Sequence, residues 1–213
     1  MSLPSPSWIE RRLTQRVRTL SPIRFEWLTH SGEFLRARGM TRDISGTGVY
    51  SYSEYPLPAG LEVAFDLLFP AELVGREPVM FHCQGRVLRN EKFHSRFGVA
   101  ISIMSHHLID TAKFYRRSHE RVVPASPVIA QYAGSRATVH DLSEIGAFIE
   151  DPHPLPPGHK IRLRMQMEGY KAEIEVGETV VRRVAPDTGM GVEFVILPVD
   201  SRRQLREFVR RTR

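Results

Sequence analysis

The stretch TRDISGTGVY, residues 41–50, carries a short polar phrase, Asp-x-Ser-x-x-Gly, at the start of an apolar run. The same phrase returns in VHDLSEIGAF, residues 139–148, again before an apolar run. Asp141 follows Asp43 by 98 residues (141 − 43). A phrase that is repeated in the same local setting indicates a tandem duplication, in which both copies use it for the same purpose.

Further segments repeat together with these two phrases. The offset between matched segments is 105 residues upstream of the phrases (116 − 11), 98 residues near them (154 − 56) and 93 residues farther on (190 − 97). The matched segments are PLPAG at 56–60 with PLPPG at 154–158, FGVAI at 97–101 with MGVEF at 190–194, and RRLTQRV at 11–17 with RRSHERV at 116–122. The sequence therefore predicts two domains, residues 1–115 and residues 116–213.

Each copy changes its hydrophobic period once. LEVAFDLLF at 61–69 and KIRLRMQM at 160–167 alternate apolar and other residues, which is typical of a strand with one buried face. Several short strands separated by Gly and Pro turns favour a small barrel or sandwich. HHLIDTAKFYRR at 106–117 and DSRRQLREFVRR at 200–211 place apolar residues on a helical stripe instead. We therefore expect a barrel followed by a helix in each copy.

Composition limits the setting in which the chain works. Hydrophobic residues make up 41% of the 213 residues, which is enough for packed cores. No apolar run reaches the roughly 18 residues that a membrane-spanning helix needs, and no secretory signal is visible, so we expect a cytoplasmic protein without membrane insertion. The single cysteine, Cys83, excludes an internal disulfide.

The charge of the chain points to an anionic partner. The net charge is +6, and only four of the thirty cations are lysines. The planar guanidinium of arginine pairs bidentately with phosphate and with the O6/N7 edge of guanine, which an ammonium group cannot do. An arginine-rich, positively charged chain therefore favours a ligand that carries phosphate or guanine.

The repeated phrase has the chemistry of a guanine site. Asp and Ser at positions i and i+2 of an extended segment point to the same face. An ionised Asp accepts hydrogen bonds from N1–H and the exocyclic amine of guanine, and Ser can donate or accept beside it. The glycine allows the backbone to turn or to approach a ligand closely. The alternative is structural, with Asp43 and Asp141 forming Asx turns before a strand.

Arginine pairs stand upstream of both phrases. Arg-x-x-x-Arg occurs five times in the chain, so such a pair alone indicates little. Arg12 with Arg16 and Arg117 with Arg121 are the two pairs that occupy matching positions in the two copies. Position therefore selects these four arginines as the cations of the expected sites.

These motifs resemble those of the PilZ domain family. In the first copy the resemblance runs over about residues 9–117, through Arg12-x-x-x-Arg16, DISGTG, LPAG, GRVLR and FGVAI. It implies a six-stranded antiparallel β-barrel with a following helix, and binding of the bacterial second messenger cyclic di-GMP. The implied fold class is all-β, with two tandem six-stranded antiparallel β-barrels, each followed by an α-helix.

The resemblance also implies the ligand-binding residues, two arginines for phosphate and guanine and an Asp–Ser pair for the base. The first set is Arg12, Arg16, Asp43, Ser45 and Gly48. The second set is Arg117, Arg121, Asp141, Ser143 and Gly146. In the second copy Glu144 adds a carboxylate close to the ligand, and the gap between arginine pair and Asp is shorter, 20 residues (141 − 121) against 27 (43 − 16).

Nothing in the sequence argues for catalysis, a metal or a bound cofactor. His106 and His107 are adjacent and cannot easily share a metal on one helix face, and Cys83 reads as a small buried hydrophobe. We therefore expect a non-enzymatic receptor that changes conformation on binding cyclic di-GMP and signals to a downstream protein. The alternatives are a nucleic-acid-binding barrel pair, which leaves the Asp–Ser pair unexplained, and a PilZ pair that has lost its ligand.

Overall fold

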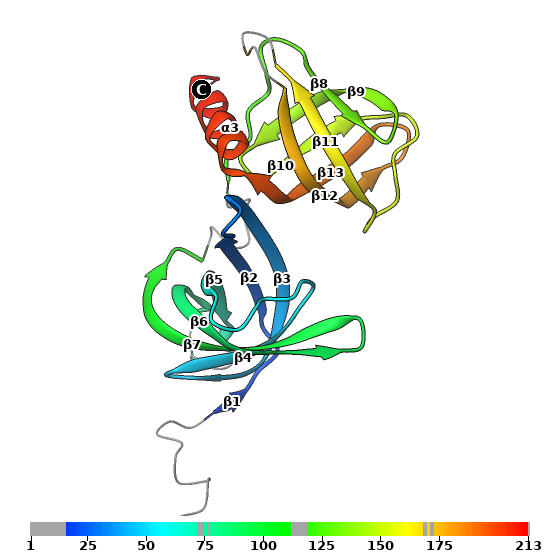
Figure 1. Ribbon diagram of the computed structural model, residues 1–213. Coiled ribbons are helices and arrows are strands. Elements are labelled where there is room, and N and C mark those ends of the chain that lie inside the picture. Colours follow the sequence, from blue (N-terminus) through cyan, green and yellow to red (C-terminus); the bar gives the residue numbers. More distant parts are fainter. Residues whose placement is uncertain are drawn as a thin grey trace, which may run out of the picture. The chain divides into compact units, whose positions relative to one another are not determined.

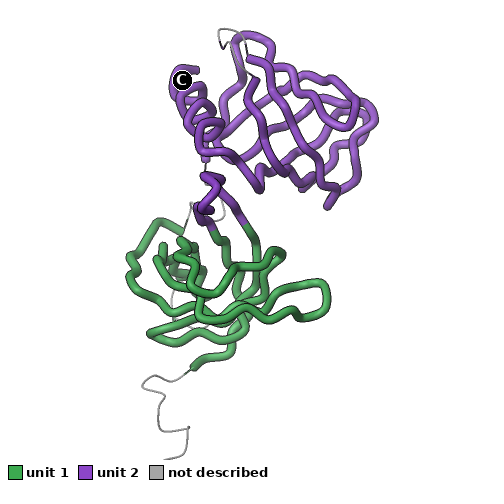
Figure 2. The backbone as a smooth tube through the Cα atoms, in the orientation of Figure 1, with its two compact units in different colours: residues 1–25, 37–114 green, residues 26–36, 115–213 purple. Residues whose placement is uncertain are grey.

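The computed structural model describes residues 16–71, 75, 77–111, 119–167, 170 and 173–212. The chain divides into two compact units (Figure 2). Unit 1 comprises residues 1–25 and 37–114, and unit 2 comprises residues 26–36 and 115–213. Among the described residues, no helix is long and apolar enough to cross a membrane.

Unit 2 contains a closed barrel of six strands (Figure 1). Its elements are β8 (Val128–Tyr132), β9 (Ser135–Ser143), β10 (Gly146–Glu150), β11 (Lys160–Gln166), β12 (Ile174–Ala185), β13 (Gly189–Pro198) and the helix α3 (Val199–Arg211). The strand order is β10-β9-β8-β11-β12-β13, and β10 also pairs with β13, which closes the ring. Every neighbouring pair is antiparallel.

The alternating pattern of the sequence explains the interior of this barrel. Along β11 the side chains of Ile161, Leu163 and Met165 are buried, whereas the residues between them are exposed. The barrel core continues into α3 through Leu205. The helix carries an acidic residue in its first turn and arginines in its last turn, which suits the helix dipole.

The remaining strands lie in unit 1, apart from residues 26–36, which belong to unit 2. They are β1 (Val17–Arg18), β2 (Pro22–Leu28), β3 (Glu33–Ser45), β4 (Gly48–Ser53), β5 (Glu62–Phe69), β6 (Val79–Phe93) and β7 (Arg96–Ile109). Six of them follow the order β3-β2-β5-β6-β7-β4, with an additional pairing between β3 and β4, and β1 pairs with β3. The ends of β2 and β3 at residues 26–36 belong to unit 2, where Leu35 pairs with Ile196 of β13.

The expected fold class is confirmed only in part. The chain is mostly β, with one six-stranded antiparallel barrel, additional strands and a C-terminal helix. The prediction of two barrels that are each followed by a helix is wrong, because residues 106–109 of the expected first helix continue β7. His106 pairs there with Cys83 of β6. This long-range ladder overrides a weak helical stripe, and residues 112–117 lie outside the described part of the chain.

Candidate functional site

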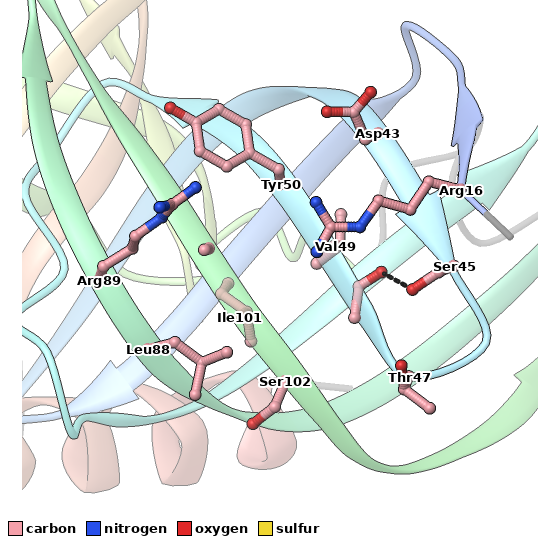
Figure 3. A pocket seen from close by; sticks show the side chains of 12 residues that line it. Arg16, Asp43, Ser45, Thr47, Val49, Tyr50, Leu88, Arg89, Ile101 and Ser102 are labelled. Atoms are coloured by element: carbon pink, nitrogen blue, oxygen red, sulfur yellow. Dashed lines mark hydrogen bonds between the residues drawn. The ribbon is translucent and has the colours of Figure 1, made fainter. Parts of the chain in front are cut away.

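Unit 1 holds a cavity of about 400 Å³ at the turn between β3 and β4, with β6 and β7 forming its other wall (Figure 3). It is lined by Arg16, Asp43, Ser45, Thr47, Gly48, Val49, Tyr50, Leu88, Arg89, Ala100, Ile101 and Ser102. Four of the five residues expected at the first site therefore lie around one cavity. The fifth, Arg12, lies outside the described residues.

Strand β1 brings the arginine to the phrase. Val17 pairs with Ile44 in an antiparallel register, so the preceding residue, Arg16, comes opposite Ser45. The backbone pairing thus carries an exposed guanidinium to the rim of the cavity. A cation held beside a carboxylate and a hydroxyl can pair with a phosphate oxygen or with the acceptor edge of a base.

The Asp and the Ser of the phrase face the cavity because the strand alternates. Ile44 between them is buried in the core, with 4% of its surface exposed. Ser45 Oγ donates a hydrogen bond to the Gly48 carbonyl at 3.2 Å, which closes the turn (Figure 3). Asp43 lies within β3, opposite Tyr50, so it is a strand residue rather than the start of an Asx turn.

A neighbouring arginine already holds the Asp43 carboxylate. Arg42 Nε donates to Asp43 Oδ2 at 2.6 Å, and the same guanidinium lies 3.9 Å from the centre of the Tyr50 ring. Burial alone lowers the pKa of Arg42, but the hydrogen bond and charge of Asp43 outweigh burial, so the pKa is raised. Arg42 therefore stays charged and orients the carboxylate toward the cavity rim.

Tyr50 and Arg89 also line the cavity, although the sequence predicted neither of them at the first site. Arg89 stands across the cavity from Arg16 (Figure 3), with its guanidinium 5.9 Å from the Tyr50 ring centre and 3.2 Å from Glu91. A register shift in β6 between Val87 and Arg89 lets Arg89 line the cavity. The sequence provided only a weak indication of this role, the final arginine of GRVLR, because a register shift within a strand cannot be recognised from the local sequence.

The glycine of the phrase has a structural task as well. A Cβ atom on Gly48 would lie 2.9 Å from the Ile101 carbonyl oxygen of β7. At Gly146 a Cβ would be closer still to the Val192 carbonyl oxygen of β13. The close approach that the sequence predicted at this position is thus an approach to the neighbouring strand.

The second phrase lies in unit 2 with the same backbone setting. Ser143 is buried, and its Oγ donates to the Gly146 carbonyl at 3.1 Å. Arg121 donates a hydrogen bond to Asp141 Oδ1. These four residues of the expected second site therefore lie together, and the fifth, Arg117, is outside the described part of the chain.

Electrostatics at the second phrase differ from those at the first. The expected ligand arginine, Arg121, is itself the ion-pair partner of Asp141, and His140 Nδ1 lies 3.7 Å from the other carboxylate oxygen. Glu144 pairs with Arg206 of α3 at 3.1 Å. A ligand that entered here would have to exchange partners with an existing ion pair.

Metal chemistry has no support in the described residues, among which no group of three or more His, Cys, Asp or Glu side chains could hold an ion. His106 and His107 lie in β7, where their rings contact Phe81 and His82 across the ladder. Burial, followed by the charge of Asp66, raises the pKa of the Cys83 thiol to about 12, so this thiol is protonated at neutral pH.

Residues 115–211 match the PilZ domain family. This region is a PilZ domain. The match falls on the second copy, whereas the motifs gave the fuller resemblance in the first. No curated protein matches the sequence.

Solved structures resemble the chain over most of its length. The Bacillus subtilis inhibitor of motility MotI/DgrA is 17% identical, with a TM-score of 0.39, and the match covers 92% of this chain and 96% of that chain. MrkH of K. pneumonia in its apo state is 12% identical, with a TM-score of 0.48 and coverages of 90% and 86%. YcgR of Escherichia coli in complex with c-di-GMP is 12% identical, with a TM-score of 0.39 and coverages of 90% and 83%.

Proposed function

We propose that the protein is a non-enzymatic receptor for cyclic di-GMP, and that its main site is the cavity of unit 1. The observation that carries this proposal is that Arg16, Asp43, Ser45 and Gly48 line one cavity. Its volume of about 400 Å³ falls within the roughly 300–1,000 Å³ of small-molecule sites. Ligand binding changes the conformation of the chain and passes the signal to a downstream protein.

Each side chain has a role that suits this ligand. Asp43 accepts from N1–H and the amine of guanine, and Ser45, which donates its own hydrogen to Gly48, can accept a hydrogen bond beside it. Arg16 and Arg12 pair with phosphate oxygens or with the O6/N7 edge of guanine. Arg89 supplies a further cation from the opposite wall. A dianionic ligand with two guanines uses all of these groups at once.

We further propose that unit 1 is a diverged copy of the PilZ domain in unit 2. Three features support this. Val17 pairs with Ile44, and Val122 pairs in the same way with Leu142, which follows Ile44 by 98 residues (142 − 44). Both phrases contain the same Ser-to-Gly hydrogen bond. The strand order β3-β2-β5-β6-β7-β4 also has the same sequence of neighbours as β9-β8-β11-β12-β13-β10.

The second phrase is proposed as a weaker site for the same ligand, formed by Arg117, Arg121, Asp141, Ser143 and Gly146. Binding there competes with the Arg121–Asp141 pair, in which the expected ligand arginine is already engaged. Glu144 adds negative charge, part of which Arg206 offsets. Both effects disfavour a dianion relative to the site in unit 1.

Calorimetric titration tests the proposal. The wild-type chain should bind cyclic di-GMP, while GMP, GTP and a short oligonucleotide should bind at least about tenfold more weakly. Arg16→Ala and Asp43→Ala should each weaken binding of cyclic di-GMP by at least about tenfold, because each removes a charged partner. Arg86→Ala is the matched control, since Arg86 pairs with Glu62 at 2.8 Å and does not line the cavity.

The other outcomes separate the alternatives. Tighter binding of the oligonucleotide with steep salt dependence would favour a nucleic-acid-binding protein. Absence of binding by a natively folded chain would favour a PilZ pair that serves as an interaction module. Unchanged affinity in both variants would reject the assignment of the site in unit 1.

A further inference from the structure

Unit 2 carries a larger concave surface, with a volume of about 900 Å³, that contains no residue of the second phrase. It is formed by the β8–β9 hairpin, by β11 and β12, and by the end of β13. Arg136 lines it near the start of β9, and Asp141 stands five residues farther along the same strand, about 16 Å away in extended backbone. The surface is therefore separate from the proposed nucleotide site of this unit.

The polar side chains of this surface form a row across four strands. Strand pairing aligns Arg136 with Gln131, Gln131 with Arg164, and Arg164 with Glu175. Arg162 lies two residues from Arg164 on the same outward face of β11. We call the surface lined by these five residues the arginine groove.

The arginine groove contains cations that the described part of the chain does not neutralise. The guanidinium groups of Arg136 and Arg162 make no hydrogen bond or ion pair with any described residue, and both residues are exposed. Arg164 has one distant carboxylate, Glu173, at 3.8 Å. Three guanidinium groups around one concave surface thus favour an anionic occupant.

We propose that the arginine groove binds an extended acidic segment of a partner protein, with carboxylates at alternating positions. Arg162 and Arg164 are two residues apart on a strand, so their backbone positions are about 6.6 Å apart. An extended peptide repeats the side chains of one face at the same spacing. A segment with acidic residues at every second position can therefore place one carboxylate on each guanidinium, in bidentate pairs.

Two observations favour a protein over a nucleic acid. Glu33 and Glu175 also line the groove, and these carboxylates repel a continuous polyanion more strongly than a segment in which neutral residues separate the carboxylates. Tyr132, the aromatic residue of the lining, is buried, and its hydroxyl donates to Asp151 at 2.5 Å. It therefore offers no face on which a base could stack.

The test is an NMR titration of the 15N-labelled full chain with two synthetic peptides of equal composition. One alternates Glu and Thr, and the other has its Glu residues in a block. The alternating peptide should bind at least about threefold more tightly, and its amide shifts should fall on Gln131, Arg136, Arg164 and their neighbours. The double variant Arg162→Gln, Arg164→Gln should weaken that binding about tenfold, since it removes two charged contacts.

The matched control is Arg203→Gln, Arg210→Gln, which removes the same charge from exposed positions of α3 and should change binding by less than about twofold. Equal loss in the two double variants, equal binding of the two peptides, or tighter binding of an oligonucleotide of equal charge would each overturn the proposal. If the groove variant does not fold, Arg136→Gln replaces it, with an expected weakening of about threefold. Because the test needs no nucleotide, its outcome is independent of the proposed receptor function.

Discussion

Asp43 illustrates how a proposed ligand-binding residue depends on a neighbour that the motif does not include. Its carboxylate accepts from Arg42, whose guanidinium also covers the Tyr50 ring. A guanine that approaches Asp43 therefore meets a carboxylate that is already oriented and partly neutralised. The sequence predicted the Asp and the Ser as a pair, but the role of Arg42 depends on side-chain directions that spacing does not determine.

Arg89 gives the first prediction at this scale. Arg89→Ala should weaken binding of cyclic di-GMP about tenfold, because it removes a cation from the cavity wall opposite Arg16. Calorimetric titration measures the change. Arg86→Ala removes the same charge from the same strand but outside the cavity, so equal effects of the two variants would contradict a direct role for Arg89.

Cys83 gives the second prediction. Its thiol is buried and its pKa is raised to about 12, so the thiolate is scarce near neutral pH. Iodoacetamide at pH 8 should leave the thiol of the folded protein unmodified and alkylate that of the urea-unfolded protein, as followed by mass spectrometry. Equal alkylation rates in the two states would show that the site opens readily.

At the scale of the elements, the sequence predicted what local periodicity encodes. The strand expected over residues 160–167 is present as β11, and the helix expected over residues 200–211 is present as α3. The helix expected over residues 106–117 is replaced by strand at residues 106–109, because its stripe has few apolar residues while β6 offers a long ladder to residues 96–109. Local pattern cannot detect a partner that lies elsewhere in the sequence.

The alternation of apolar residues also did not determine how the strands of the two copies correspond. The matched segments set Ile101 against Phe194, at an offset of 93 residues. Strand pairing sets Ile101 beside Val49, and Val192 beside Ala147, so within the proposed duplication Ile101 corresponds to Val192 at an offset of 91 (192 − 101). A shift by two residues keeps every side chain on the same face, so alternation cannot distinguish the two registers.

The phrase glycines give a prediction for the pairing of strands. Gly146→Ala should lower the free energy of unfolding of unit 2 by about 1–3 kcal/mol, because its Cβ would collide with the Val192 carbonyl oxygen across the ladder. Gly177→Ala is a milder comparison, since its Cβ would lie 3.1 Å from a methyl group of Ile196 that can shift. Urea denaturation of both variants measures the difference, and a smaller effect at Gly146 than at Gly177 would contradict this account.

At the scale of the whole molecule, residues 26–36 group with a region that lies about a hundred residues farther along the chain. The sequence THSG at residues 29–32 forms the turn between β2 and β3, and Gly32 there has a left-handed φ of 77°. The sequence did not indicate that Glu26 would pair with Arg36 at 3.2 Å and with Arg202 of α3 at 2.5 Å. These ion pairs all lie within unit 2. The pair with Arg202 joins segments that are far apart in the sequence, so local sequence patterns could not predict it.

Two titratable groups near these ion pairs, Glu26 and His119, have lowered pKa values in the folded state. Burial alone raises the pKa of Glu26, but the charges of Arg36 and Arg202 outweigh it and leave the pKa below the ordinary value of 4.5. Burial, together with the charge of Arg36, lowers the pKa of His119 below its ordinary value of 6.5. In both cases the unfolded chain takes up a proton at a higher pH than the folded chain does.

The stability of unit 2 should therefore fall as the pH is lowered. Below pH 6.5 the unfolded chain protonates His119 while the folded chain does not, and below pH 4.5 the same holds for Glu26. Each contribution is fully present above the unfolded pKa and is lost as the pH drops through the folded pKa. His119→Gln should flatten the upper part of this decline and Glu26→Gln the lower part.

Trp27 provides the measurement, because it is buried, belongs to unit 2 and is one of two tryptophans in the chain. In a Trp8→Phe background its fluorescence follows urea unfolding at pH 7.5, 6, 5 and 4. Glu62→Gln is the control, since this carboxylate lies in unit 1 and is largely exposed. An unfolding free energy that stays constant from pH 7.5 to 4 would contradict this account. A Glu62→Gln profile as flat as that of Glu26→Gln would likewise show that Glu26 and His119 do not cause the loss of stability at low pH.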